Sequence, residues 1–175
     1  MTTNVPRGLI VAAALGMVHA AFSLSWTAGG TLPVWSLGDD LVESFRGREW
    51  LLVPIGIAKL VAAVAPLALV RWGWLARVAA RFACRMGAFV LVVWGGLNTI
   101  VGSLVLAGVV RPESGFDRSG MIGHAYLWDP LFLVWAAAVT TGLIASRGRT
   151  IEPRCAFGWR DPLAAALAGG PPRLG

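Results

Sequence analysis

The chain has 175 residues, of which 57% are hydrophobic and 14% are charged, and its formal net charge is +6. This composition excludes an ordinary soluble domain and indicates a polytopic membrane protein. The positive charge does not indicate nucleic-acid binding, because the basic residues lie at the ends of apolar runs, as they do in membrane proteins.

Four apolar runs in the sequence each reach the roughly 20 residues that are needed to cross a bilayer. They cover about residues 8–28, 50–70, 86–110 and 121–146. The pattern predicts an all-α fold, in which residues 1–146 form a bundle of four transmembrane helices. Residues 147–175 are basic and rich in Pro and Gly, and we expect them to form a poorly ordered tail.

The charges of the connecting segments predict the orientation of the bundle. Residues 71–85 and the tail are rich in Arg, whereas residues 29–49 hold four acidic and two basic side chains, a net charge of −2, and residues 111–120 are neutral. By the positive-inside rule, both termini are cytoplasmic. Because 14 of the 15 basic residues are Arg and because Ala, Gly and Pro are frequent, we interpret the membrane as the plasma membrane of a bacterium with a GC-rich genome.

Two connecting segments each admit two interpretations. Residues 71–85 place Arg77, Arg81 and Arg85 at helical spacing, which predicts a basic amphipathic helix at the cytoplasmic surface. Its arginines either contact lipid head groups or act as a topology signal that extends the third span, and we favour the second interpretation. Residues 41–45 are apolar on one side, and they form either a short helix on the membrane surface or part of a solvated loop.

Polar residues inside the apolar runs form the candidate site. A carboxylate in a membrane span is costly, so Asp129 is expected to have a partner inside the bundle, and Lys59 is the candidate of opposite charge. Counted at about 1.5 Å per residue, His19, Lys59 and Asp129 lie about 12–13 Å below the outer ends of their spans. Asn98 lies somewhat deeper in the third run.

This match in depth leaves two interpretations open. In the first, Lys59 and Asp129 form a buried ion pair that fixes the register of the helices. His19 and Asn98 are then hydrogen-bonded beside that pair. In the second, the cluster is the floor of a pocket that opens to the outer face, with further residues around it. These residues are Trp26, His124, Tyr126 and Trp128.

We expect no cofactor and no metal site. His124 lies much nearer the membrane surface than His19, which disfavours a haem held between them. Cys84 and Cys155 are far apart and show no metal-binding or redox spacing. The sequence also lacks a nucleotide-binding motif and the spacing of a Ser–His–Asp triad, so no catalytic residue is assigned.

Two stretches of the chain resemble a known family. They are HAAFSLSWTAGG, at His19–Gly30, and GHAYLWDPLFLVW, at Gly123–Trp135. Together with the four spans, they resemble a family of small bacterial membrane proteins that is common in actinobacteria and is catalogued as a domain of unknown function. The resemblance covers about residues 7–146. It implies four spans and no established activity, and it assigns a role to no residue.

Three functions are compatible with these observations. The first is a binding or accessory membrane protein that recognises an amphipathic, lipid-like small molecule or a helix of another membrane protein. The second is a small intramembrane enzyme that acts on a lipid or an isoprenoid, with His19 or His124 as the acid–base group and Asp129 orienting it. The third is an oligomeric small transporter or proton path that uses Lys59 and Asp129.

Overall fold

The computed structural model describes residues 5–31, 34–113 and 115–147, and within these ranges the regular structure is entirely helical. Four helical segments are long and apolar enough to cross a membrane, which confirms the predicted all-α fold with four spans. They are α1 (Arg7–Thr27), η2 and α3 (Glu49–Leu51 and Leu52–Arg71), α4 (Val78–Leu106), and the consecutive α5, η4 and α6 (Arg118–Gly123, His124–Trp128 and Asp129–Ala145). Shorter elements connect them, namely η1 (Val34–Leu37), α2 (Asp39–Phe45) and η3 (Trp74–Ala76).

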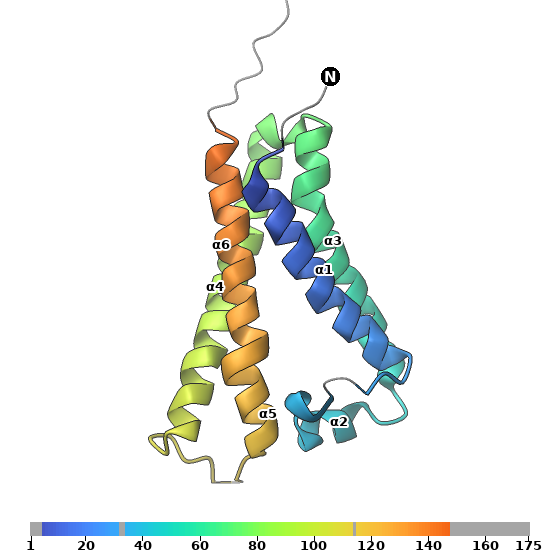
Figure 1. The fold of residues 1–175 in the computed structure, drawn as a ribbon, viewed down its shortest axis with the longest axis vertical. Helices are drawn as coiled ribbons and strands as arrows, with labels where there is room; N and C mark the ends of the chain where they lie inside the picture. Colours follow the sequence, from blue (N-terminus) through green and yellow to red (C-terminus); the bar gives the residue numbers. More distant parts are fainter. Residues whose placement is uncertain (1–4, 32–33, 114, 148–175) are drawn as a thin grey trace, which may run out of the picture.

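The four long helices form two hairpins, α1 with α3 and α4 with α6 (Figure 1). Helices α1 and α6 join the hairpins, whereas α3 and α4 lie on the outside and scarcely touch each other. The hairpins meet at the end of the bundle near the N-terminus and diverge toward the other end, where α2 lies (Figure 1). The outward faces of the flanking helices are apolar and exposed, for example at Val61 and Val90, as expected for surfaces that contact lipid.

The hairpins are joined where small residues allow the helices to approach closely. Gly8 of α1 lies against Gly142 of α6, and a Cβ atom on Gly8 would come within 2.6 Å of the Gly142 amide nitrogen. Farther along α1, Gly16 leaves room for the ring of Trp135, which is 1% exposed. The closed end of the bundle is therefore packed around Trp135, and the hairpins separate toward the other end.

The third long helix begins at Val78, eight residues before the predicted start at residue 86, and so includes most of the basic segment. The chain turns at Gly73, whose φ of +72° favours glycine, and no Gly or Pro interrupts residues 78–86. Arg81 donates from Nη1 to the Leu143 carbonyl and to Ser146 Oγ, both at 3.1 Å, and thereby satisfies the C-terminal end of α6. The structure thus favours the helix-extension interpretation over a separate surface helix.

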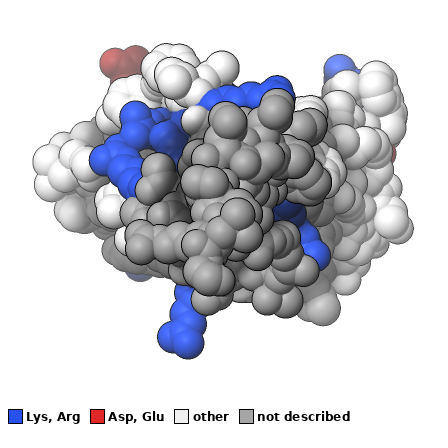
Figure 2. Space-filling model, turned by 90° about the horizontal axis from the view of Figure 1, so that it is seen from above, with Lys and Arg blue, Asp and Glu red and all other residues white. Residues whose placement is uncertain are grey.

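Basic side chains surround the end of the bundle where the hairpins meet (Figure 2). Among the described residues these include exposed Arg7, Arg71, Arg77, Arg85 and Arg147. The Arg77 guanidinium also lies over the ring of Trp74, 4.7 Å from its centroid. The predicted tail and Cys155 lie beyond the described residues.

Candidate binding pocket

A cavity of about 650 Å³ lies between the hairpins, at the end where they diverge. Its walls come from α1, α3, η4, α6 and one residue of α4, Trp94. The segment that contains η1 and α2 closes part of its mouth through Leu41, Val42 and Phe45. Residues 39–45 therefore form a helix that covers the pocket, instead of the solvated loop that was the alternative.

Six of the eight residues proposed for a polar cluster or pocket line this cavity. They are His19, Trp26, Lys59, His124, Trp128 and Asp129. Tyr126 is 66% exposed and is not part of the lining, because a residue two positions from both His124 and Trp128 projects from the other side of the helix. Asn98 is half-buried on α4 and also lies outside the lining, since α4 contributes to the cavity only one turn earlier, at Trp94.

Lys59 is bound to α1 and does not form an ion pair with Asp129. Its ammonium group donates to Ser23 Oγ at 2.9 Å and lies 3.3 Å from His19 Nδ1. It also lies 5.6 Å from the centroid of the Phe132 ring. The direct ion pair of the first interpretation is therefore not formed, because α3 packs against α1 and Lys59 is directed toward the polar side chains of α1.

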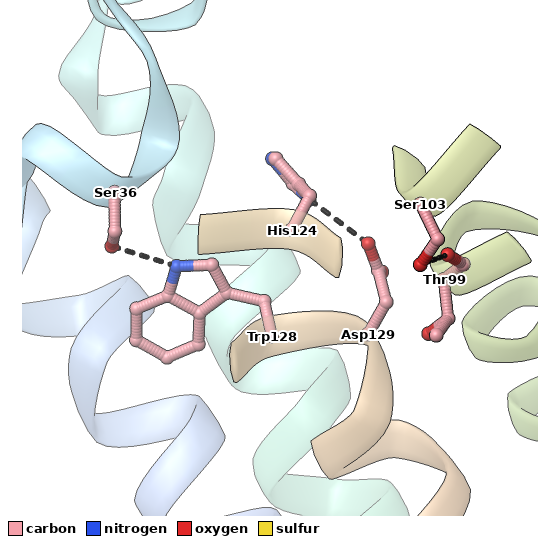
Figure 3. Close-up of polar contacts among 6 residues, drawn as sticks. All are labelled: Ser36, Thr99, Ser103, His124, Trp128 and Asp129. Carbon is pink, nitrogen blue, oxygen red and sulfur yellow. Dashed lines mark hydrogen bonds and ion pairs between the residues drawn. The ribbon is translucent and has the colours of Figure 1, made fainter. Parts of the chain in front are cut away.

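Asp129 has His124 as its partner (Figure 3). The carboxylate is part of a residue that is only 1% exposed, and its Oδ2 lies 3.1 Å from His124 Nδ1. On the α4 side, the Ser103 hydroxyl donates to the Thr99 carbonyl, and the buried Thr99 hydroxyl has no hydrogen-bond partner among the described residues. Neither hydroxyl therefore binds the carboxylate, and His124 is its hydrogen-bond partner among the described residues.

A π-helical turn, η4, brings His124 and Asp129 together. In a regular α-helix, side chains five positions apart point about 140° away from each other, whereas a π-helical turn joins residues five positions apart. Pro130 explains the turn, because it has no amide hydrogen and its ring would collide with the carbonyl of Tyr126 in a regular helix. Such turns often occur at functional sites.

Trp128 attaches the covering segment to the bundle (Figure 3). Its indole nitrogen donates to Ser36 Oγ at 2.9 Å, and its ring packs edge to face against Trp26 at 5.3 Å. Gly123 permits this contact, because a Cβ atom there would overlap the Ser36 carbonyl oxygen. The aromatic residues that were predicted to surround the pocket therefore also fix the segment that covers it.

A second attachment of the covering segment is made by Asp117. Its carboxylate caps the N-terminus of α5 and also accepts a hydrogen bond from the Asp39 amide, at the start of α2. Hydrogen bonds from the Ser119 hydroxyl and from the Asp39 amide lower the pKa of Asp117 to about 2. This group stays ionised at physiological pH, so the link between α5 and α2 is not broken by ordinary changes in pH.

Several residues of the pocket were not predicted as site residues. Ser23 lies one turn after His19 on the same face of α1, so helical spacing alone could have identified it. Phe132 stacks on His19 with ring centroids 4.1 Å apart. Trp94 is 61% exposed and resembles any other lipid-facing aromatic residue in the sequence. Its place in the wall depends on how the hairpins are arranged.

Residues 16–139 match the family model described as Protein of unknown function (DUF3995). The chain belongs to the DUF3995 family. No curated protein and no solved structure matches the chain. The matched region extends from the middle of α1 into α6 and contains all six predicted residues that line the pocket. The resemblance to a family of unknown function is therefore confirmed. Because the description of DUF3995 names no activity, the function has to be inferred from the pocket.

Within the described residues, no three His, Cys, Asp or Glu side chains are grouped in a way that could hold a metal ion. His19 and His124 line one cavity, but each is engaged by a different charged residue, Lys59 and Asp129 respectively. What the arrangement offers chemically is an ammonium group, a His–Asp pair and an apolar wall.

Proposed function

We propose that this DUF3995 protein is an integral membrane protein that binds an amphipathic, lipid-like small molecule in the pocket between its hairpins. The observation that carries the proposal is the cavity of about 650 Å³ that contains Lys59, His19 and Asp129. Its volume is within the range of about 300–1,000 Å³ that is typical of small-molecule sites, and such sites combine an apolar wall with a few converging polar groups.

The position of the pocket supports a ligand that arrives from the bilayer. Helices α3 and α4 scarcely touch, and each of them has an exposed residue that also lines the pocket, Ile55 on α3 (43% exposed) and Trp94 on α4 (61% exposed). A molecule dissolved in the membrane can therefore pass between these two helices. The polar groups would then hold its head, and its apolar chain would lie against Ile55, Trp94 and Phe132.

The proposal includes the orientation of the protein. Since basic side chains surround the closed end of the bundle, we place that end in the cytoplasm of a bacterium and the pocket on the outer side of the plasma membrane. In a cysteine-free background, an impermeant maleimide added to intact cells is expected to label Glu113→Cys, in the loop between α4 and α5. The matched variant Arg147→Cys should be labelled only after lysis, and the reverse pattern would overturn the orientation.

The binding proposal predicts that filling the pocket expels the ligand. In Ile55→Trp, the larger side chain occupies the passage between α3 and α4, and we expect the amount of co-purified amphiphile to fall several-fold. Ile57→Trp is the matched control, because Ile57 lies on the same helix, is 50% exposed and does not line the pocket. The measurement is native mass spectrometry of protein extracted in mild detergent. Equal retention by both variants would contradict the proposal.

A second candidate is a small intramembrane enzyme, and the His124–Asp129 pair specifically favours it. A buried carboxylate at 3.1 Å from a partly exposed histidine that lines a cavity is an arrangement suited to general acid–base catalysis, in which Asp129 orients His124. The same mass-spectrometry experiment tests it, since His124→Gln should then accumulate a bound molecule of a different mass, the unreacted substrate. Lys59 and Asp129, the residues of the transporter or proton-path hypothesis, line the same cavity and have different hydrogen-bond partners, Ser23 and His124 respectively.

A further inference from the structure

We infer that the pocket selects an amphiphile with an anionic head, a carboxylate or a phosphate, and that the ammonium group of Lys59 binds this head. The inference rests on the proposed binding function and adds the chemical class of the ligand. It follows from the hydrogen bonds and the charges around Lys59.

The hydrogen bonds show that Lys59 has a donor to spare. An ammonium group has three donors and no acceptor. Two of these donors are directed at Ser23 Oγ, at 2.9 Å, and at His19 Nδ1, at 3.3 Å. Because the ammonium group can only donate, His19 Nδ1 must accept, and the ring proton of this neutral histidine is then on Nε2. Both partners of Lys59 are therefore uncharged, and one ammonium proton is left for a ligand.

The charges show that Lys59 has no direct ion pair among the described residues, although the carboxylate of Asp129 acts on it without direct contact. Two other ionic side chains in the lining, Arg46 and Glu49, lie at the mouth, where Arg46 pairs with Glu43 at 2.8 Å and Glu49 accepts from the Gly47 amide. The remaining carboxylate, Asp129, is paired with His124. Among the described residues, none brings a carboxylate within ion-pair distance of Lys59. An ammonium group without a direct ion pair is costly in a membrane span, and an anionic ligand that contacts it lowers that cost.

The same geometry argues against a cationic head. Trp26, Trp128 and Phe132 provide the aromatic surfaces on which quaternary ammonium groups commonly bind. Lys59 already lies over the Phe132 ring, 5.6 Å from its centroid, so a second cation would be repelled. A head with one negative charge fits this position, with its apolar chain extending between α3 and α4.

The test compares probes that share one chain and differ in the head. Hexadecanoate, hexadecyl phosphate, hexadecan-1-ol and hexadecyltrimethylammonium are titrated against the purified full-length protein, and the bound fraction is measured by native mass spectrometry. We expect at least one anion to bind about tenfold or more tightly than the alcohol, and the cation to bind most weakly. The comparison between the two anions distinguishes a fatty-acid carboxylate from a lipid phosphate as the source of the head.

Variants of Lys59 assign the preference to this residue. Lys59→Met should reduce binding of the anions to the level of the alcohol while the alcohol still binds, and Lys59→Arg should keep the preference. If the alcohol binds the native protein as tightly as both anions, the inference is overturned but the pocket for amphiphiles is retained. If Ile55→Trp reduces the binding of none of the probes, the proposed function fails as well. The comparison of probes on the native protein tests the preference for an anionic head even if Lys59→Met does not fold.

Discussion

Replacement of His124 by Leu is expected to lower the free energy of unfolding by about 3–5 kcal/mol, because it leaves a buried carboxylate without its partner. Asp129 is 1% exposed, and the hydrogen bond that the structure gives its carboxylate is the one with His124, at 3.1 Å. The measurement is unfolding by sodium dodecyl sulfate in mixed micelles. A loss below about 1 kcal/mol would show that Asp129 is neutral or finds another partner.

A double-mutant cycle distinguishes the observed pair from the one that the sequence predicted. Asp129→Leu combined with His124→Leu should be milder than the sum of the single changes by about 1 kcal/mol or more, since the two side chains are in contact. Asp129→Leu combined with Lys59→Met should deviate less from additivity than the His124 pair, because no direct ion pair joins these two side chains. Strong coupling between Lys59 and Asp129 would instead indicate that these two side chains form a direct ion pair.

Trp135→Ala is the second change with a large expected effect, a loss of about 3–5 kcal/mol in the free energy of unfolding. The Trp135 ring is 1% exposed and contacts Gly16 at the junction of α1, α3 and α6, so its removal leaves a cavity where the hairpins are joined. The control is Trp72→Ala, because Trp72 is 67% exposed. Its loss should change the free energy of unfolding by less than about 0.5 kcal/mol, measured in the same micelles.

If Trp135→Ala unfolds no more easily than Trp72→Ala, the hairpins are not held together by this contact. In that case Trp135→Ala should also leave ligand retention unchanged. Because the closed end of the bundle sets the angle at which the hairpins diverge, a weakened junction should reduce ligand retention together with stability. Ile55→Trp, in contrast, should reduce retention without a comparable loss of stability.

Much of the architecture was predictable because it depends on local properties of the chain. Length and apolarity decide whether a segment crosses a membrane, so the four runs identified the four long helices. The cost of polar groups in a span likewise marked His19, Lys59 and Asp129 as residues that need partners, and all three line one cavity. His19 and Trp26 are two helical turns apart in the sequence, and both are buried on α1.

Which partner each polar residue has was decided by the tertiary structure. In a lipid-facing helix almost every side is apolar, so the sequence pattern does not reveal which helices are neighbours. The neighbour of α3 is α1, and Lys59 therefore binds Ser23 and His19 instead of Asp129. The pairing of Asp129 with His124 required the π-helical turn, which regular helical spacing does not predict.

The pocket itself also depends on contacts between distant parts of the chain. Trp94 and Phe132 belong to its wall because the hairpins diverge, and α2 covers its mouth because Trp128 and Asp117 hold the connecting segment. The sequence by itself determined that the protein has four membrane helices and which of its polar side chains need partners, because burial in lipid acts on each helix separately. Only the tertiary structure decided the partners and the cavity, because both result from the angle and order in which the helices pack.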